Sequence, residues 1–288
     1  MKSYALLTLL ALFGCQSPSV PVEPPPAAPE ADGIVRRAVV INLLTTADGL
    51  ACPGTDVDAD TAWVWCYRME GTRLADGQAR RSAIEAAIRK ANEGMRPQDL
   101  LFIFISGHGT TRPDADGDEP SGNDSGLVLW DSIWWDDEVW RFVCTLRPCR
   151  IDLVTDTCFA EGNWRYVRRT LHYATLGLVP RSQRLEFNLG DGGAGKWREG
   201  NPALREGGNR RQEWAGQISQ FAACSDHSYS YGVATGGTGT QTLNELLQPG
   251  ITRAALFAAW KKAMPRDQQP VWSTYGMTDE FRNGVMFK

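Results

Sequence analysis

A histidine and a cysteine each follow a short apolar run in this sequence, and together they could break an amide bond. His108 stands between two glycines after residues 100–105, which are all apolar. Cys158 follows a second, largely apolar run, RIDLVTD, at residues 150–156. A thiol is a weak nucleophile until a neighbouring group such as an imidazole accepts its proton. The pair therefore predicts nucleophilic catalysis at Cys158. A structural histidine in a tight turn and an inert buried cysteine are the alternatives.

Two neighbouring parallel strands would bring His108 and Cys158 together. Both runs are too short to span a membrane, and residues 100–105 are too continuously apolar for a half-exposed strand, so we expect strands buried on both faces of a sheet. Residues 78–93 repeat apolar residues at helical spacing and predict the crossover helix that precedes the histidine strand. Parallel neighbours end at the same edge of a sheet, which is where open α/β sheets bind ligands.

The rest of the chain supplies the other elements of one large domain over residues 34–288. We expect strands over 35–44 and 217–224, helices over 58–69, 136–146, 236–248 and 251–263, and a final edge segment over 271–287. The sequence contains no internal repeat and no second-domain boundary. The predicted fold class is α/β, in three layers, with a mostly parallel central sheet flanked by helices.

The composition is that of an ordinary soluble protein. It is 42% hydrophobic and 22% charged, with a formal net charge of −4. Because there is no basic excess, we expect no nucleic-acid partner. The eleven tryptophans are scattered along the chain, which favours core positions over a sugar-binding surface. We expect a monomer.

The N-terminus predicts a lipid anchor. Lys2 precedes an apolar run over residues 4–13 that is too short for a stable membrane span, so residues 1–14 are typical of a signal peptide. The run ends in Leu-Phe-Gly before Cys15, which resembles the lipobox of bacterial lipoproteins. This resemblance implies cleavage before Cys15 and a lipid on its thiol, and Gln16 points to the outer membrane of a bacterial envelope. An ordinary secretory signal with a chance cysteine is the alternative.

Residues 15–33 are expected to be an extended tether between that lipid and the domain. They hold six prolines among small and acidic residues, and they show no apolar periodicity.

From about residue 37 to its end the chain resembles caspase-fold cysteine peptidases of the metacaspase or bacterial orthocaspase kind. Four segments carry the resemblance: SGHGTTRPDADGDEPSGNDSGLVLWD (106–131), IWWDDEVW (133–140), DTCFAEG (156–162) and AACSDHSYSYGVATGGTGTQTLNELL (222–247). The sequence departs from the family at residues 159–162, where Phe-Ala-Glu-Gly stands in place of the usual His-Ser-Gly. The departure leaves the nucleophile in place but changes the adjacent loop.

The resemblance implies a Cys–His dyad and a polypeptide substrate. His108 would accept the proton of Cys158, the thiolate would attack the scissile carbonyl, and His108 would return a proton to the leaving amine. The backbone N–H groups of Gly109 and Cys158 are implied as the oxyanion donors, each worth about 3 kcal/mol in comparable reactions. The chemistry requires no cofactor.

Acidic residues near the dyad predict cleavage after arginine or lysine. Asp156 lies two residues before the nucleophile, and Asp226 ends a neighbouring strand. Carboxylates in the pocket would receive a basic P1 side chain, and arginine can bind them with two hydrogen bonds. The alternative role for Asp156 is to cap a loop. Ser106, at the start of the histidine motif, is expected in the same pocket.

The family places a further pocket aspartate after a Gly-Cys turn near residue 55. Asp58 fits this position best because an alanine follows it, and Asp60 is the competitor. The alternative for either residue is a helix N-cap, a role that short carboxylates perform well.

The sequence also raises the expectation of a calcium-binding site. The acidic loop DADGDEPSGND is not an EF-hand, because glycine occupies its fourth place and no glutamate closes it. The resemblance points instead to Asp124, Asp136 and Asp137 as matches for calcium-binding aspartates of some family members. A fourth family aspartate falls near Arg165 in this chain, which should weaken the site. A solvated acidic loop is the alternative.

The remaining expectations concern processing and cysteine pairing. Residues 188–211 are rich in glycine and arginine, so they offer sites for self-cleavage. In an oxidising envelope, two disulfides are expected, Cys52–Cys66 and Cys144–Cys149, which leaves Cys224 near the site.

Two functions compete with the peptidase. The first is a non-catalytic caspase-like binding module, which the altered residues after Cys158 favour. The second is a calcium- or sugar-binding surface lipoprotein, which rests on the acidic loop and the tryptophans.

Overall fold

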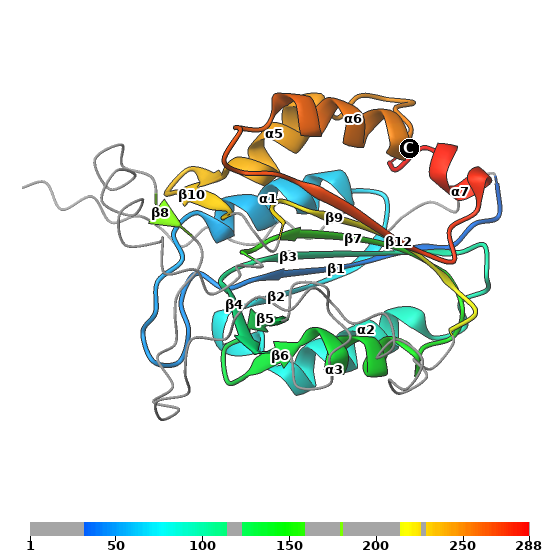
Figure 1. Cartoon of the computed structure of the whole chain (residues 1–288). Helices are drawn as coiled ribbons and strands as arrows, with labels where there is room; N and C mark the ends of the chain where they lie inside the picture. The colour runs from blue at the N-terminus through cyan, green and yellow to red at the C-terminus, as the bar shows by residue number, and fades with distance from the viewer. Residues whose placement is uncertain (1–31, 114–122, 159–178, 181–213, 226–228, 288) are drawn as a thin grey trace, which may run out of the picture.

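A computed structural model of the chain describes residues 32–113, 123–158, 179–180, 214–225 and 229–287. Figure 1 shows a twisted central sheet between two layers of helices. Helices α1 (Thr55–Trp65), α5 (Thr238–Leu246) and α6 (Arg253–Ala263) cover one face. Helices α2 (Arg81–Asn92) and α3 (Asp136–Val143) cover the other, and the short α7 (Asp279–Asn283) lies near the C-terminus.

The central sheet has six strands in the order β12-β9-β7-β3-β1-β2. Their bounds are β1 Arg36–Asn42, β2 Glu70–Ala75, β3 Leu100–Ser106, β7 Arg150–Asp156, β9 Gln217–Ala222 and β12 Val271–Tyr275. Five strands run parallel, and β12 pairs antiparallel with β9 at one edge. The predicted three-layer α/β class is confirmed.

The apolar side chains of β3 pack into two hydrophobic cores, one on each face of the sheet. All seven of its residues are buried. Because successive side chains of a strand point to opposite faces, Leu101, Ile103 and Ile105 join the core under α2 and α3. Phe102 and Phe104 join the core under α1, α5 and α6. A strand with two buried faces has no solvent-facing positions, which is why residues 100–105 do not alternate between apolar and polar.

A buried ion pair fastens α6 to the sheet. Arg253 donates from Nε to Asp152 Oδ1 (2.7 Å) and from a terminal nitrogen to Oδ2 (2.5 Å), and both side chains are almost fully buried. Arg253 also donates to the carbonyls of Phe281, Gly284 and Val285, so it joins β7 to the C-terminal segment. Burial raises the pKa of Asp152, and Arg253 opposes that rise.

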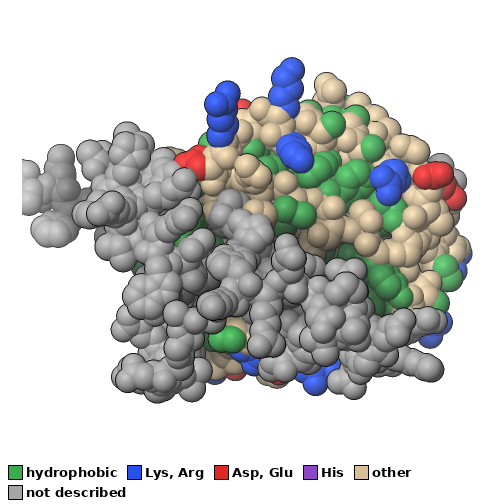
Figure 2. Space-filling view, viewed as in Figure 1, with side chains coloured by type: hydrophobic (Ala, Val, Ile, Leu, Met, Phe, Trp, Pro, Cys, Tyr) green, Lys and Arg blue, Asp and Glu red, His purple; other side chains and the backbone are tan. Residues whose placement is uncertain are grey.

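The outer surface over α6 is basic. Its last turn carries Lys261 and Lys262, and Figure 2 shows Lys and Arg side chains projecting over this part of the molecule. Cations at the C-terminal end of a helix interact favourably with its dipole.

Several elements differ from the sequence prediction. The helix expected over residues 58–69 begins at Thr55 and ends at Trp65, and the edge strand β2 follows it. Residue 109 starts an unpredicted antiparallel sheet of β4 (Gly109–Pro113), β5 (Asn123–Val128) and β6 (Ile133–Trp135). A second small sheet joins β8 (Val179–Pro180), β10 (Tyr231–Val233) and β11 (Gly236–Gly237). These strands have only two to six residues, and β4, β5 and β11 are also rich in glycine or polar residues, so none shows the apolar pattern that identifies longer strands.

Within the described residues no helix is long and apolar enough to cross a membrane. The predicted signal peptide, the lipid site at Cys15 and nearly all of the tether lie outside the described residues. So do Asp226, Arg165 and residues 188–211.

Candidate active site

The strand register brings His108 and Cys158 to one edge of the sheet. Strands β3 and β7 are parallel neighbours, and Ser106, the last residue of β3, pairs with Asp156, the last residue of β7. His108 and Cys158 each follow this pair by two residues, so the two chains leave the sheet side by side. The backbone at Gly109 lies directly against Cys158. A Cβ built at residue 109 would fall 1.3 Å from the Cys158 carbonyl oxygen, so only glycine fits there.

Main-chain groups form hydrogen bonds with both the imidazole ring and the backbone of His108. The ring nitrogen Nε2 lies 2.9 Å from the carbonyl oxygen of Ala51. A carbonyl only accepts, so Nε2 carries the hydrogen, and in the neutral ring Nδ1 is left as the proton acceptor. The carbonyl of His108 accepts a hydrogen bond from Val128 N at 3.0 Å. The role of Ala51 was not predicted, because a main-chain carbonyl accepts a hydrogen bond whatever side chain the residue carries.

Residue Ser230 covers the sulfur of Cys158. The backbone N–H of Ser230 donates to Sγ at 3.0 Å, and the thiol lies 3.4 Å from the Ser230 carbonyl oxygen, to which it can donate. Cys158 is fully buried and packs in a small cluster with Cys224 and Tyr229. Ser230 therefore contacts the sulfur through both its N–H and its carbonyl oxygen.

The carboxylate of Asp156 is buried, and both of its oxygens accept hydrogen bonds. Oδ1 accepts a hydrogen bond from Ser230 Oγ, and Oδ2 accepts from both N and Oγ1 of Thr240, each at 2.7 Å. Thr240 lies in the first turn of α5, whose N-cap is Gly237 and offers no side chain. Asp156 therefore caps that helix from β7, which satisfies an N–H that the helix itself leaves open.

Asp58 lies in the same buried cluster. Its Oδ2 accepts from Ser106 Oγ at 2.8 Å, and its Oδ1 accepts from Gly237 N at 2.7 Å. Asp58 is completely buried in α1, and Gly54 occupies the N-cap position. Asp60 instead is exposed and forms an ion pair with Arg73. Of the two competing aspartates, only Asp58 reaches the site.

A glycine-rich turn lies directly over the two carboxylates. A Cβ at Gly236 would lie 2.9 Å from Asp58 Oδ1, and a Cβ at Gly239 would lie 3.1 Å from Asp156 Oδ2. Gly236 has a φ of +121°, which side chains rarely adopt. This turn was not predicted, although the Gly-Gly pair at 236–237 is a turn signal in the sequence.

The three expected calcium ligands lie around β5 and α3. Asp124 pairs with Arg112, whose Nε lies 2.6 Å from Oδ2. Asp136 accepts hydrogen bonds from the backbone N–H groups of Ser125 (3.2 Å) and Asp137 (3.1 Å). Burial raises the pKa of Asp136, and the charges of Asp124 and Asp137 add to the rise. The described part of the chain contains no group of three or more His, Cys, Asp or Glu side chains placed to hold a metal. Calcium binding therefore stays a prediction.

The expected disulfides are wrong. Across the described ranges all six cysteines are thiols, including the pairs Cys52–Cys66 and Cys144–Cys149. Cys149 Sγ instead accepts a hydrogen bond from Asn92 Nδ2 at 3.4 Å, and burial raises its pKa to about 12. Burial also raises the pKa of Cys66 well above its usual value. Cysteine number and spacing alone carried the expectation, and neither reports where the side chains point.

Sequence comparison finds partial matches to metacaspases. No protein-family model matches the chain. Metacaspase-1 from two strains of Cryptococcus neoformans is 34% identical over 84 residues and 35% identical over 92 residues. The chain spans less than a fifth of the length of these relatives, 18% and 19%, and each match covers 27% of the chain itself.

The fold occurs in solved structures. Protein GSU0716 from Geobacter sulfurreducens superposes with a TM-score of 0.67 and 22% identity, over 88% of this chain and 98% of that one. Caspase-1 from Spodoptera frugiperda has a TM-score of 0.48 and 16% identity, over 85% and 87% of the two chains. The first shows a common fold. The metacaspase matches confirm, over about a quarter of the chain, its resemblance to the caspase-fold cysteine peptidases.

Proposed function

We propose that this chain is a cysteine endopeptidase that cleaves polypeptides after arginine or lysine through a thioester. The observation that carries the proposal is the register of β3 and β7, which lets His108 and Cys158 leave the same sheet edge together. The metacaspase similarity supports the same class of reaction.

His108 acts as the base and then as the acid. Nδ1 takes the proton of Cys158, and the thiolate forms a bond to the scissile carbonyl carbon. The imidazolium then gives its proton to the leaving amine as the C–N bond breaks, and water hydrolyses the thioester. The Ala51 carbonyl accepts from Nε2 throughout, so it holds the ring orientation and stabilises the imidazolium. The N–H groups of Gly109 and Cys158 are proposed as the oxyanion donors.

Asp58 and Asp156 support specificity for a basic P1 residue. The groups that donate hydrogen bonds to these carboxylates are neutral, so none of them forms an ion pair with either carboxylate. These donors are Ser106, Gly237, Ser230 and Thr240. A guanidinium or ammonium group entering this site would meet two carboxylates, with Asp226 proposed as a third.

Ser230 must move before a substrate can react. Its backbone contacts the sulfur of Cys158, and its hydroxyl donates to Asp156. The nucleophile and one pocket carboxylate are therefore covered by the same residue, so displacing it would open both together.

Three finer features belong to the same proposal and rest on the sequence. They are stimulation by calcium, self-cleavage within residues 188–211, and a lipid anchor at Cys15 in a bacterial envelope, in the outer membrane.

Fluorogenic peptides that end in arginine, lysine or aspartate test the proposal. The full chain should release the fluorophore after arginine and lysine only. C158A and H108A should each lose at least about a thousandfold in kcat/KM, the usual scale for removing a dyad member. C144S, which changes the half-buried cysteine that follows α3, is the matched control and should retain activity. Cleavage after aspartate, or full activity in C158A, would refute the proposal.

A non-catalytic binding module is the second candidate, and the buried sulfur of Cys158 favours it. In that case an arginyl chloromethylketone would leave Cys158 unlabelled with and without calcium.

A further inference from the structure

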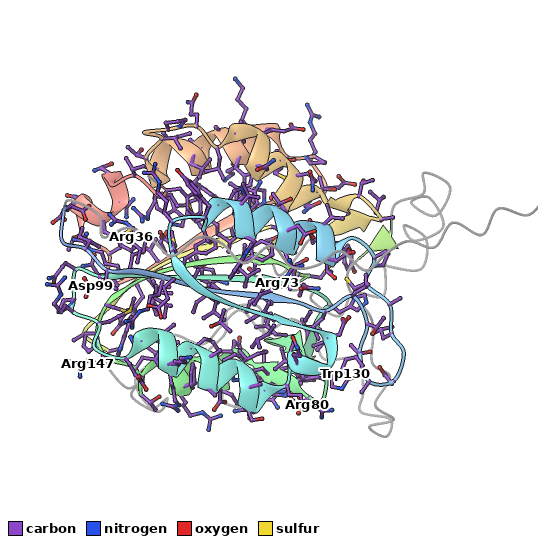
Figure 3. All side chains as sticks on the ribbon, turned by 180° about the vertical axis from the view of Figure 1, so that it is seen from behind. Arg36, Arg73, Arg80, Asp99, Trp130 and Arg147 are labelled. Carbon is purple, nitrogen blue, oxygen red and sulfur yellow. The ribbon has the colours of Figure 1, made fainter. Side chains whose placement is uncertain are left out.

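A cavity of about 520 Å³ lies between the segment around Leu50 and the segment over residues 128–135. Leu50, Trp130, Ile133 and Trp135 form much of its lining, and the exposed side chains of Asp48 and Asp131 contribute two carboxylates. Figure 3 shows Trp130 at the opposite end of the molecule from Asp99, which precedes β3. The cavity therefore lies at the carboxyl ends of the strands, as the dyad does.

Both walls of the cavity are attached to the dyad histidine. Leu50 directly precedes Ala51, whose carbonyl accepts the hydrogen bond from the imidazole. Val128, in the opposite wall, donates its N–H to the His108 carbonyl. The walls also meet each other, because Ala47 N donates to the Trp130 carbonyl at 3.3 Å. A ligand in the cavity would thus lie next to His108 without touching the sulfur.

The cavity and the two buried carboxylates lie toward opposite faces of the sheet. Asp58 belongs to α1, and Asp156 caps α5, both in the upper layer of Figure 1. The β5–β6 wall packs into the core under α2 and α3, in the lower layer. His108 contacts both cavity walls, through Ala51 on one side and Val128 on the other. Because the protonated imidazole gives its proton to the leaving amine, the amine-side fragment of a substrate leaves past His108, toward this cavity.

We propose that the cavity binds a lysine or arginine side chain of the substrate on the amine side of the scissile bond. The inference rests on the proposed peptidase function. Leu50, Ile133 and Trp130 would pack against the apolar stem of such a side chain, and the two carboxylates would bind its charged end. Arg112 already lies over the Trp135 ring, 4.2 Å from its centroid, so Trp130 is assigned the contact with the ligand.

The hydrogen-bond donors to the two carboxylates are neutral groups. Asp48 accepts a hydrogen bond from the Thr46 hydroxyl. Asp131 accepts from the Ser132 hydroxyl and from the backbone N–H of Arg81. All three donors are neutral, so they orient the carboxylates without cancelling their charge. Both aspartates are exposed, which is why their replacement by asparagine should leave the fold intact.

Two kinds of substrate distinguish an effect on binding in this cavity from an effect on catalysis by the dyad. An arginyl aminocoumarin amide has no residue on the amine side, whereas internally quenched peptides can carry lysine or glutamine at each of the first two positions after arginine. The full chain, D48N, D131N and the double variant are compared on all of them. E93Q is the matched control, because Glu93 is an exposed carboxylate that follows α2 near Arg37, at the other end of the sheet.

The double variant should lose at least tenfold in kcat/KM on the lysine peptides and less than twofold on the glutamine peptides. Its activity on the aminocoumarin amide should stay within twofold, and E93Q should match the parent throughout. D48K should reverse the preference, so that a glutamate peptide becomes better than a lysine peptide.

Other outcomes refute the proposal in distinguishable ways. Equal cleavage of both peptide sets by the parent and the double variant would overturn the subsite while the peptidase stands. An equal loss on all substrates would mean that the aspartates act on His108 itself, which also overturns the subsite. No cleavage of any substrate by the parent would refute the proposed function.

Discussion

Replacing Asp156 by asparagine or by alanine separates the charge of the candidate pocket from its hydrogen bonds. Asp156 accepts three hydrogen bonds, two from Thr240 and one from Ser230. An asparagine can keep all three contacts, because its oxygen accepts from Thr240 while its amide donates to the Ser230 hydroxyl. Alanine removes every acceptor and leaves the Thr240 N–H at the start of α5 unsatisfied.

The expected stability changes follow from these contacts. A hydrogen bond to a charged group contributes about 1.5–3 kcal/mol, and an unsatisfied buried donor costs about 1–3 kcal/mol. Because the two hydroxyls can rotate toward other acceptors, we expect a loss of about 3–5 kcal/mol for D156A. For D156N we expect about 1 kcal/mol, since only the charge is lost. Urea denaturation of the full-length variants measures both values.

The expected activity change follows from the charge. Removing one partner of a desolvated charge pair costs about 2–3 kcal/mol, which corresponds to a loss of roughly 30- to 150-fold in kcat/KM for arginyl substrates. D60N, the exposed aspartate that competed in the sequence, is the control and should change activity less than twofold. If D156N were as active as the parent and D156A merely unstable, Asp156 would be only a helix cap, and the assignment of the P1 pocket would fail.

Three further predictions test the packing. R253M should lose about 3–5 kcal/mol of unfolding free energy by urea titration, because it leaves Asp152 buried without its partner; a loss below 1 kcal/mol would contradict this. Burial raises the pKa of Asp136 above its ordinary value of 3.8, so the stabilisation that this residue contributes should be full at low pH and should be lost as pH rises through the raised pKa. D136N should abolish this loss of unfolding free energy, and identical pH profiles for the two proteins would refute the prediction. Iodoacetamide should modify Cys66 and Cys149 only after unfolding, as read by mass spectrometry; rapid labelling in the native protein, or a disulfide at either residue, would count against their burial as thiols.

The strands that hold the dyad could be predicted because burial leaves a strong pattern. The predicted cysteine strand matches β7 residue for residue, and the run starting at Leu100 is β3. A strand covered on both faces is mostly apolar, as all of β3 from Leu100 to Ile105 is, so its sequence is distinctive. The edge strand β2 is half exposed and mixes charged residues with glycine, so it was missed.

Contacts made by the main chain could not be predicted. Ala51 and Ser230 touch the dyad through backbone atoms, which every residue possesses. The choice between Asp58 and Asp60 needed the structure as well, since both lie within one turn of α1 and only burial distinguishes them. The cysteine pairings failed for the related reason that disulfides depend on geometry rather than on spacing.

The central claim is that His108 activates Cys158 to attack the peptide bond that follows a basic residue. The most direct measurement is covalent labelling of the full chain with an arginyl chloromethylketone, followed by peptide mass spectrometry. We expect a single adduct on Cys158, which forms at least a hundredfold more slowly in H108A, and no adduct from an aspartyl reagent. An adduct on another cysteine, or equal labelling with and without His108, would contradict it.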